Sequence, residues 1–169
     1  MNKSNKNKGF SLIEIIVVIA LMAIVTGATM SIYSWIKTQR IEKLTENISD
    51  CINDLRTACT SKDGEYMLYI TKTNGEYIAT IYKDGGTKYK ETKLGSIGSI
   101  EVYDTAGNKY SISSSNHLHI RFDKSTGGIK ILEIYDSGSK NVKGEIVIKY
   151  SDRTRKIVIS EITGKHYIE

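Results

Sequence analysis

The sequence predicts an α+β protein in which one long N-terminal helix packs on a C-terminal antiparallel β-sheet domain. Three observations support this class. The 169 residues contain no proline, so nothing breaks a helix between Phe10 and Lys62. The 22 residues from Ile15 to Ile36 carry no charge. After Gly64, short runs rich in Ile, Val, Tyr and Thr alternate with turn residues, as in an antiparallel sheet.

The first half of this helix, residues 10–36, is expected to span a membrane. Its uncharged segment would measure about 33 Å as a helix, against a hydrocarbon core of about 30 Å. Tyr33 and Trp35 stand at its outer end, where aromatic rings favour the membrane interface. Three lysines before the segment favour a cytoplasmic N-terminus: Lys3, Lys6 and Lys8. Three basic residues after it weaken that bias: Lys37, Arg40 and Lys43.

The second half of the helix, residues 37–63, is amphipathic and needs a partner surface. Apolar residues recur there at spacings of three and four, which places them in one stripe: Ile41, Leu44, Ile48, Cys51, Leu55 and Ala58. Cys51 and Cys59 would lie about 12 Å apart on a helix, too far for a disulfide. We therefore expect two small buried thiols. The "SKDG" sequence, Ser61 to Gly64, should end the helix.

Residues 64–169 are expected to form a β-rich head that covers the stripe. Asn74-Gly75 between "EYMLYITK" and "EYIATIYK" is a strong hairpin signal. Asp84-Gly85-Gly86 should open a looser stretch. Further strands are predicted for "SIEVYD", "KYSISS", "HLHIRFD", "GIKILEIYD", "EIVIKYS" and "RKIVISE", with "SGSKNVKG" among the connecting turns.

The head offers no set of residues typical of an enzyme, and we expect neither a cofactor nor a metal site. No nucleophile, base and acid occur in a known catalytic motif, and no phosphate-binding loop is present. His117 and His119 alternate on one strand, where a solvent-exposed polar face is the better interpretation than a zinc site. "DTAGN", Asp104 to Asn108, fits a hairpin turn better than a calcium loop. "YSDRTRK", Tyr150 to Lys156, could touch DNA phosphates, but a solvated basic turn is the commoner case.

The sequence "KGFSLIE", Lys8 to Glu14, carries the strongest functional signal. A short basic leader ends in Gly9, Phe10 follows, and Glu14 is the fifth residue after Gly9, ahead of the apolar run. This pattern resembles the class III signal of type IV pilins and type II secretion pseudopilins. The resemblance implies that a prepilin peptidase removes residues 1–9 and methylates the new amine of Phe10, with Lys8 as the charge before the cleavage site.

Cleavage would give Glu14 a role in assembly. A carboxylate in lipid is costly, but in a filament Glu14 could pair with the Phe10 amine of a neighbouring subunit and set the stagger between subunits. A glutamate that snorkels to the membrane surface is the alternative. Small residues would allow close helix packing in such a filament: Ala20, Ala23, Gly27 and Ala28.

The C-terminal part bears a looser resemblance to the GspH/FimT type of minor pseudopilin. The fragments that carry it are "IRFDKSTGGI", Arg155 to Ser160 and Thr163 to Ile168. The resemblance implies a minor subunit of a type IV pilus, type II secretion or competence-type filament. Its partners would be other pilin subunits, prepilin peptidase, an assembly platform protein in the membrane and, indirectly, an assembly ATPase. The protein would start in the cell membrane, with the C-terminal domain outside, and then enter an extracellular filament.

Two alternatives remain open. The chain could be a single-pass membrane protein whose extracellular β domain serves binding or adhesion. It could also be a secreted hydrolase, which the missing catalytic set disfavours, with an ordinary signal peptide cut after "TGA", Thr26 to Ala28. A glutamate within the apolar core, and the extension of that core to Ile36, argue against the signal peptide.

Overall fold

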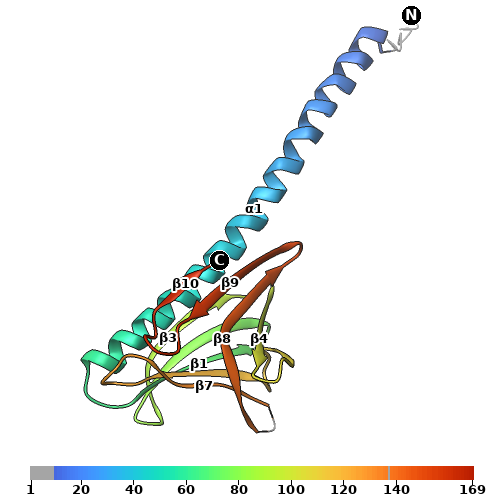
Figure 1. Ribbon diagram of the computed structural model, residues 1–169. Coiled ribbons are helices and arrows are strands. Elements are labelled where there is room, and N and C mark those ends of the chain that lie inside the picture. The colour runs from blue at the N-terminus through green and yellow to red at the C-terminus, as the bar shows by residue number, and fades with distance from the viewer. Residues whose placement is uncertain (1–9, 137) are drawn as a thin grey trace, which may run out of the picture. The chain divides into compact units, whose positions relative to one another are not determined.

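The computed structural model describes residues 10–136 and 138–169, except for the side chains of residues 28–31. One helix, α1 (Leu12–Ser61), precedes a run of strands, as Figure 1 shows. The chain divides into two compact units, with the boundary between Ile36 and Lys37. The predicted α+β architecture, a long N-terminal helix followed by a curled antiparallel sheet, is confirmed.

The head unit, from Lys37 onward, contains the second half of α1 and ten strands among the described residues. The strands are β1 (Tyr66–Thr73), β2 (Glu76–Lys83), β3 (Thr87–Gly95), β4 (Ser99–Asp104), β5 (Lys109–Ser111), β6 (His117–Phe122), β7 (Ile129–Tyr135), β8 (Ser139–Tyr150), β9 (Arg153–Ile159) and β10 (His166–Ile168). Their order across the sheet is β10-β9-β8-β7-β6-β1-β2-β3, and β4 pairs with both β8 and β5.

The long strand β8 joins the two parts of the curled sheet. Its first residues, Ser139 to Asn141, pair with β7, and its later residues pair with β9 on one side and β4 on the other. Gly144 lies between these segments. A Cβ atom there would collide with the carbonyl oxygen of Ile159. The close approach of β9 therefore requires glycine at this point.

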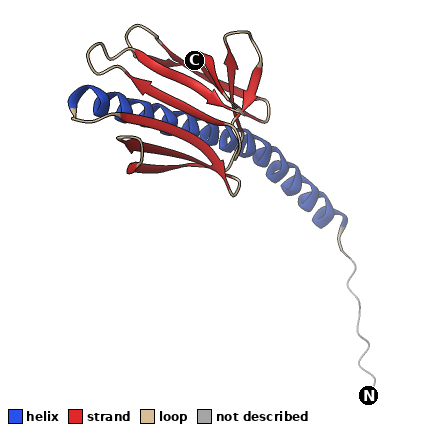
Figure 2. Ribbon diagram, turned by 90° about the horizontal axis from the view of Figure 1, so that it is seen from below, coloured by secondary structure: helices blue, strands red, loops and turns tan. Residues whose placement is uncertain are grey.

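The core lies between the amphipathic half of α1 and the sheet, an arrangement that can be followed in Figure 2. All six residues of the predicted stripe are buried, and Ile52 and Cys59 join them. Strands β1 and β6 contribute the alternating residues Leu68, Ile70, Leu118 and Ile120. Both cysteines are buried and free, as expected.

The sequence prediction of the strands was right in most places and wrong in three. The Asn74-Gly75 turn joins β1 to β2, with φ values of 50° and 80°, as a two-residue hairpin requires. The stretch after Gly86, however, is the nine-residue strand β3. "SGSKNVKG" is largely the first half of β8 rather than a turn. Strand β10, which pairs with β9 near the C-terminus, was not predicted.

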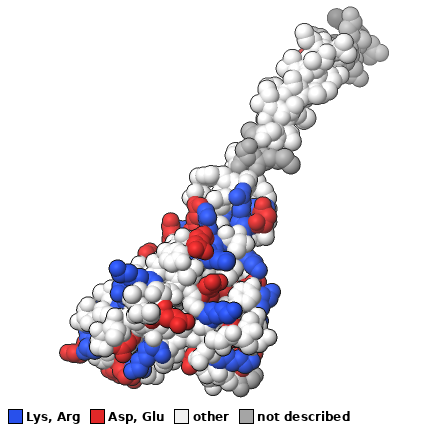
Figure 3. All heavy atoms as spheres, in the orientation of Figure 1, with Lys and Arg blue, Asp and Glu red and all other residues white. Residues whose placement is uncertain are grey.

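The edge strand β3 is short of apolar residues. Three lysines lie along it, Lys88, Lys90 and Lys93, and each forms an ion pair with a carboxylate. Charge of both signs is spread over the head in Figure 3, while the first half of α1 is nearly free of it. Charged edges of this kind resist pairing with strands of other molecules.

Candidate functional site

The N-terminal segment that carries the processing motif is held at the start of α1. The helix begins at Leu12, directly after Ser11, and the Ile15 amide donates to the Ser11 carbonyl over 3.3 Å. Glu14 Oε2 accepts a hydrogen bond of 2.7 Å from the backbone N–H of Ser11. Ser11-Leu12-Ile13-Glu14 thus forms one arm of a capping box, in which the glutamate of the first turn reaches back to the residue before the helix.

This contact gives Glu14 a local role that the spacing argument alone did not identify. The first amides of a helix lack partners within it, and its N-terminal end carries partial positive charge. A carboxylate in the first turn accepts a hydrogen bond from one of these amides and also offsets the partial positive charge. The serine three residues ahead of Glu14, just before the apolar run, is the sequence signal that would have revealed the cap.

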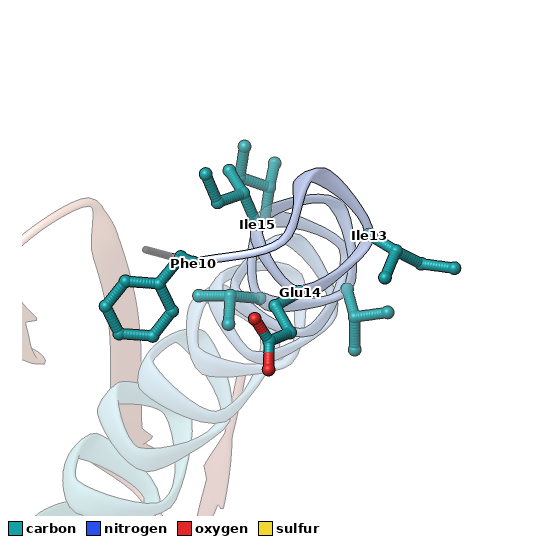
Figure 4. A pocket seen from close by; sticks show the side chains of 7 residues that line it. Phe10, Ile13, Glu14 and Ile15 are labelled. Atoms are coloured by element: carbon teal, nitrogen blue, oxygen red, sulfur yellow. The ribbon is translucent and has the colours of Figure 1, made fainter. Parts of the chain in front are cut away.

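Phe10 precedes the helix and is open to the surroundings. Its side chain is 86% exposed, and Phe10 and Ser11 lie outside any helix or strand. Figure 4 shows Phe10, Ile13, Glu14 and Ile15 pointing in different directions from the helix start. The hollow that these residues line is formed by one helix and its first residues alone, so it is an open apolar face that bears one carboxylate.

The first half of α1 is apolar and exposed along its described side chains. The helix includes a stretch long and apolar enough to cross a membrane, and none of that stretch is buried inside the protein. Together with the motif, this fits membrane anchoring. Ala20, Ala23 and Gly27 are exposed, and their spacing of three and four places them on one face. Apart from the helix backbone and the two neighbouring residues, no described heavy atom lies within 4 Å of a Cβ built on Gly27.

Three predicted residues fall partly or wholly outside the described structure. Lys8 and Gly9 precede the first described residue, and Ala28 is described only as part of the helix backbone. The structure therefore brings together Phe10 and Glu14, within the same helix start, and gives no geometry for the bond between Gly9 and Phe10.

Two segments of the head that could have served binding, the Asp104 to Asn108 segment and the basic Tyr150 to Lys156 segment, have structural roles instead. Asp104, the last residue of β4, precedes the hairpin turn and accepts hydrogen bonds from the backbone and side chain of Asn108, which lower the pKa of its carboxyl. In the basic segment Tyr150 to Lys156, Arg155 lies on β9 and pairs with Glu42 of α1 at 3.0 Å. Among the described residues, no group of three or more His, Cys, Asp or Glu side chains is arranged to hold a metal ion.

The expectation for the two histidines was wrong. His117 and His119 do share one face of β6, but they are half-buried among aromatic rings rather than solvent-exposed. The ring of His119 lies 4.1 Å from that of Tyr69 on the neighbouring strand. The alternation of the strand predicted the shared face; it could not predict that β1 and β7 would pair with this strand and place Tyr69 and Tyr135 against the imidazoles.

The comparison with protein families agrees with the motif at the start of the chain. Residues 4–30 match the model of the prokaryotic N-terminal methylation motif. No curated protein and no solved structure matches the chain significantly. The match covers Gly9, Phe10 and Glu14 together with most of the exposed apolar helix. Motif and helix together indicate a type IV pilin-like prepilin that is processed by prepilin peptidase.

Proposed function

We propose that the mature chain is a structural subunit, a minor pilin or pseudopilin, of a type IV pilus, type II secretion or competence-type filament. Cleavage between Gly9 and Phe10 would release residues 1–9, and the helix from Phe10 to Ile36 would leave the membrane to form the filament core. The observation that carries the proposal is the exposed helix start, where Phe10 lies outside the helix and Glu14 lies in its first turn.

The geometry of this start suits both steps. A peptidase needs an extended, accessible chain at the bond that it cuts, and Phe10 and Ser11 on the product side are exposed and non-helical. After cleavage, the Phe10 amine is a cation at the edge of an apolar helix. The Glu14 carboxylate of a neighbouring subunit is the group that would neutralise it, because a charge that is removed from water without a partner of opposite charge is strongly destabilising.

Helix packing in the filament would use the small residues of the same segment. Without side-chain bulk, Ala20, Ala23 and Gly27 allow two backbones to approach closely, as small residues do between membrane helices. Ala20, Ala23 and Gly27 are all exposed in the part of the chain that the structure describes. We include Ala28 in the packing face because of its sequence position.

The assignment to the GspH/FimT type rests on the C-terminal fragments. Arg155 to Ile159 belong to β9, and His166 to Ile168 form β10, which returns antiparallel to it. A minor role is also supported by the absence of two features common in major pilins, a proline in the helix and a C-terminal disulfide loop.

The decisive experiment is mass spectrometry of the mature chain from its own host, with the membrane fraction and sheared filaments analysed separately. We expect a chain that starts at Phe10 with one added methyl group in both fractions. A chain that starts at Met1 or Thr29, or that never enters the sheared fraction, would overturn the filament proposal.

The second candidate is a membrane-anchored binding or adhesion module. The observation that favours it is an aromatic cavity on the head. The two candidates differ in the fate of the N-terminus, because an anchored module would keep residues 1–9 and stay in the membrane fraction.

A further inference from the structure

A cavity of about 400 Å³ lies on the head, on the face of the sheet that points away from the core. Its lining comes from β1, β2, the turn after β2, β6 and β7: Tyr69, Thr71, Thr80, Tyr82, Gly85, Gly86, His117, His119 and Tyr135. In β1 and β6 the core residues alternate with these lining residues, so the two sets occupy opposite faces. The volume falls in the range of small-molecule sites, about 300–1,000 Å³.

Aromatic rings form a continuous wall along the cavity. Tyr69 packs at 4.1 Å on His119 and meets Tyr82 edge-on at 5.2 Å. The rings of His117, His119 and Tyr135 are nearly parallel, with centroids 5.8–6.0 Å apart. Rings that pack on one another in this way restrict one another's rotation and offer a pre-ordered aromatic surface, in which His117, His119 and Tyr135 share nearly one orientation.

The two imidazoles lack hydrogen-bond partners in the described chain. His117 Nδ1 and His119 Nε2 are both buried and unpaired, a condition that calls for an explanation in a folded protein. Burial, together with the nearby His117, lowers the pKa of His119 and so favours its neutral form. A neutral imidazole has one N–H donor and one acceptor.

The cavity lining contains no lysine, arginine, aspartate or glutamate. Glu133, which pairs with His119 across β6 and β7, accepts a hydrogen bond from Ser139. The remaining polar groups of the lining are the hydroxyls of Thr71 and Thr80 and those of the tyrosines. The site therefore selects for a neutral ligand that combines a flat apolar face with hydroxyl groups.

We propose that this cavity binds a neutral saccharide. The C–H face of a pyranose ring would stack on the aromatic wall, and its hydroxyls would pair with the threonine and tyrosine hydroxyls and, after rotation of the buried imidazoles, with their unpaired nitrogens. Tyr135, which is 47% exposed, forms the outer end of the wall. This proposal is independent of the proposed filament role, because it concerns only the head.

The test uses the full chain in polyoxyethylene detergent micelles, since alkyl-glycoside detergents would compete for the site. Saturation-transfer NMR with maltose, cellobiose and lactose, each at about 20 mM, detects binding even at millimolar Kd. We expect transfer to at least one of the three, with shifts of the His117 and His119 ring resonances. If none of them binds, the proposal is wrong.

Variants then locate the site. Tyr135→Ala should weaken saccharide binding about tenfold, the effect of one lost stacking ring. Tyr167→Ala is the matched control, because Tyr167 is 56% exposed, on β10, and does not line the cavity. Equal effects of the two changes, or none from Tyr135→Ala, would refute the site. Zinc chloride that shifts both imidazoles while the saccharides do not would instead identify a metal pair and also overturn the proposal.

Discussion

His166 Nε2, on the last strand of the chain, lies 2.7 Å from Ser49 Oγ on the helix. The contact joins groups 117 residues apart in sequence and ties β10 to the amphipathic half of α1. His166 also lies near Arg56 and Asp50. Burial is the main cause that lowers the pKa of its imidazole, the positive charge of Arg56 adds to this effect, and Asp50 opposes it.

Acidification should therefore destabilise the head. The pKa values of His166 and His119 are both lowered in the folded protein, so the unfolded chain binds their protons more readily. This contribution to stability is present above the unfolded pKa of about 6.5 and is lost as pH falls through the folded values. Urea unfolding at a series of pH values should show a falling free energy below about pH 6.5. His166→Gln should flatten this dependence, and an increase in stability on acidification would contradict it.

The stripe of α1 should dominate the stability of the head. Ile48 is fully buried between helix and sheet, and Ile48→Ala should lower the free energy of unfolding by about 2–5 kcal/mol. Asn53→Ala is the matched control, because Asn53 is exposed on the same helix and should change stability by less than about 0.5 kcal/mol. Denaturant titration followed by circular dichroism measures both. Similar effects of the two changes would contradict the packing of this helix face.

A methyl group at residue 144 should separate β8 from β9. The added Cβ would meet the Ile159 carbonyl oxygen, a backbone atom that cannot move aside alone. We expect Gly144→Ala to destabilise the head by about 1–3 kcal/mol. Gly86→Ala serves as the control, since its Cβ would enter open space. Denaturant titration measures the loss of stability in both variants. In a separate measurement, hydrogen exchange of the β9 amides should be faster in Gly144→Ala and unchanged in Gly86→Ala.

Glutamine in place of Glu14 separates its capping role from its proposed charge pairing. The amide oxygen of Glu14→Gln can still accept from the Ser11 N–H, but it cannot neutralise an amine. We expect normal cleavage and a loss of filament incorporation of at least about a hundredfold, because an unpaired buried charge costs about 3–5 kcal/mol. Quantitative blotting of sheared filaments measures the loss.

The control for that experiment is Glu46→Gln, which removes a charge from the exposed face of the same helix, beyond the apolar half. It should leave incorporation unchanged. If Glu14→Gln is incorporated normally while Glu14→Ala is not, Glu14 acts as a helix cap and the charge-pairing proposal fails.

Regular patterns made much of this fold predictable from sequence. The three-four spacing of Ile41, Leu44 and Ile48 located the buried helix face, and Asn74-Gly75 located a hairpin. Both signals are local, because they follow from the period of a helix and the φ values of one turn. The methylation motif was equally readable, since its residues are adjacent in the chain.

The missed features depend on the surroundings of each residue. Strand β3 is mostly exposed and rich in lysine, so its sequence resembles that of a loop. Only its pairing with β2 identifies it as a strand. The first half of β8 is also polar and mostly exposed, so its sequence resembles that of a loop as well. The cavity could not be found because Tyr69, Tyr82, His119 and Tyr135 come from four strands, and only the pairing of those strands in the order β7-β6-β1-β2 brings them together.

The lysines of β3 affect how neighbouring copies of the protein can contact one another when they are concentrated in a membrane. A protein anchored in a membrane is confined to two dimensions, where copies meet often and any open strand edge invites accidental joining. The edge strand β3 carries three ion-paired lysines and an irregular register, and the edge strands β5 and β10 are each only three residues long. None of these edges gives a neighbouring strand a long, flat, apolar row to extend. The head is therefore protected against accidental edge-to-edge joining where copies are concentrated.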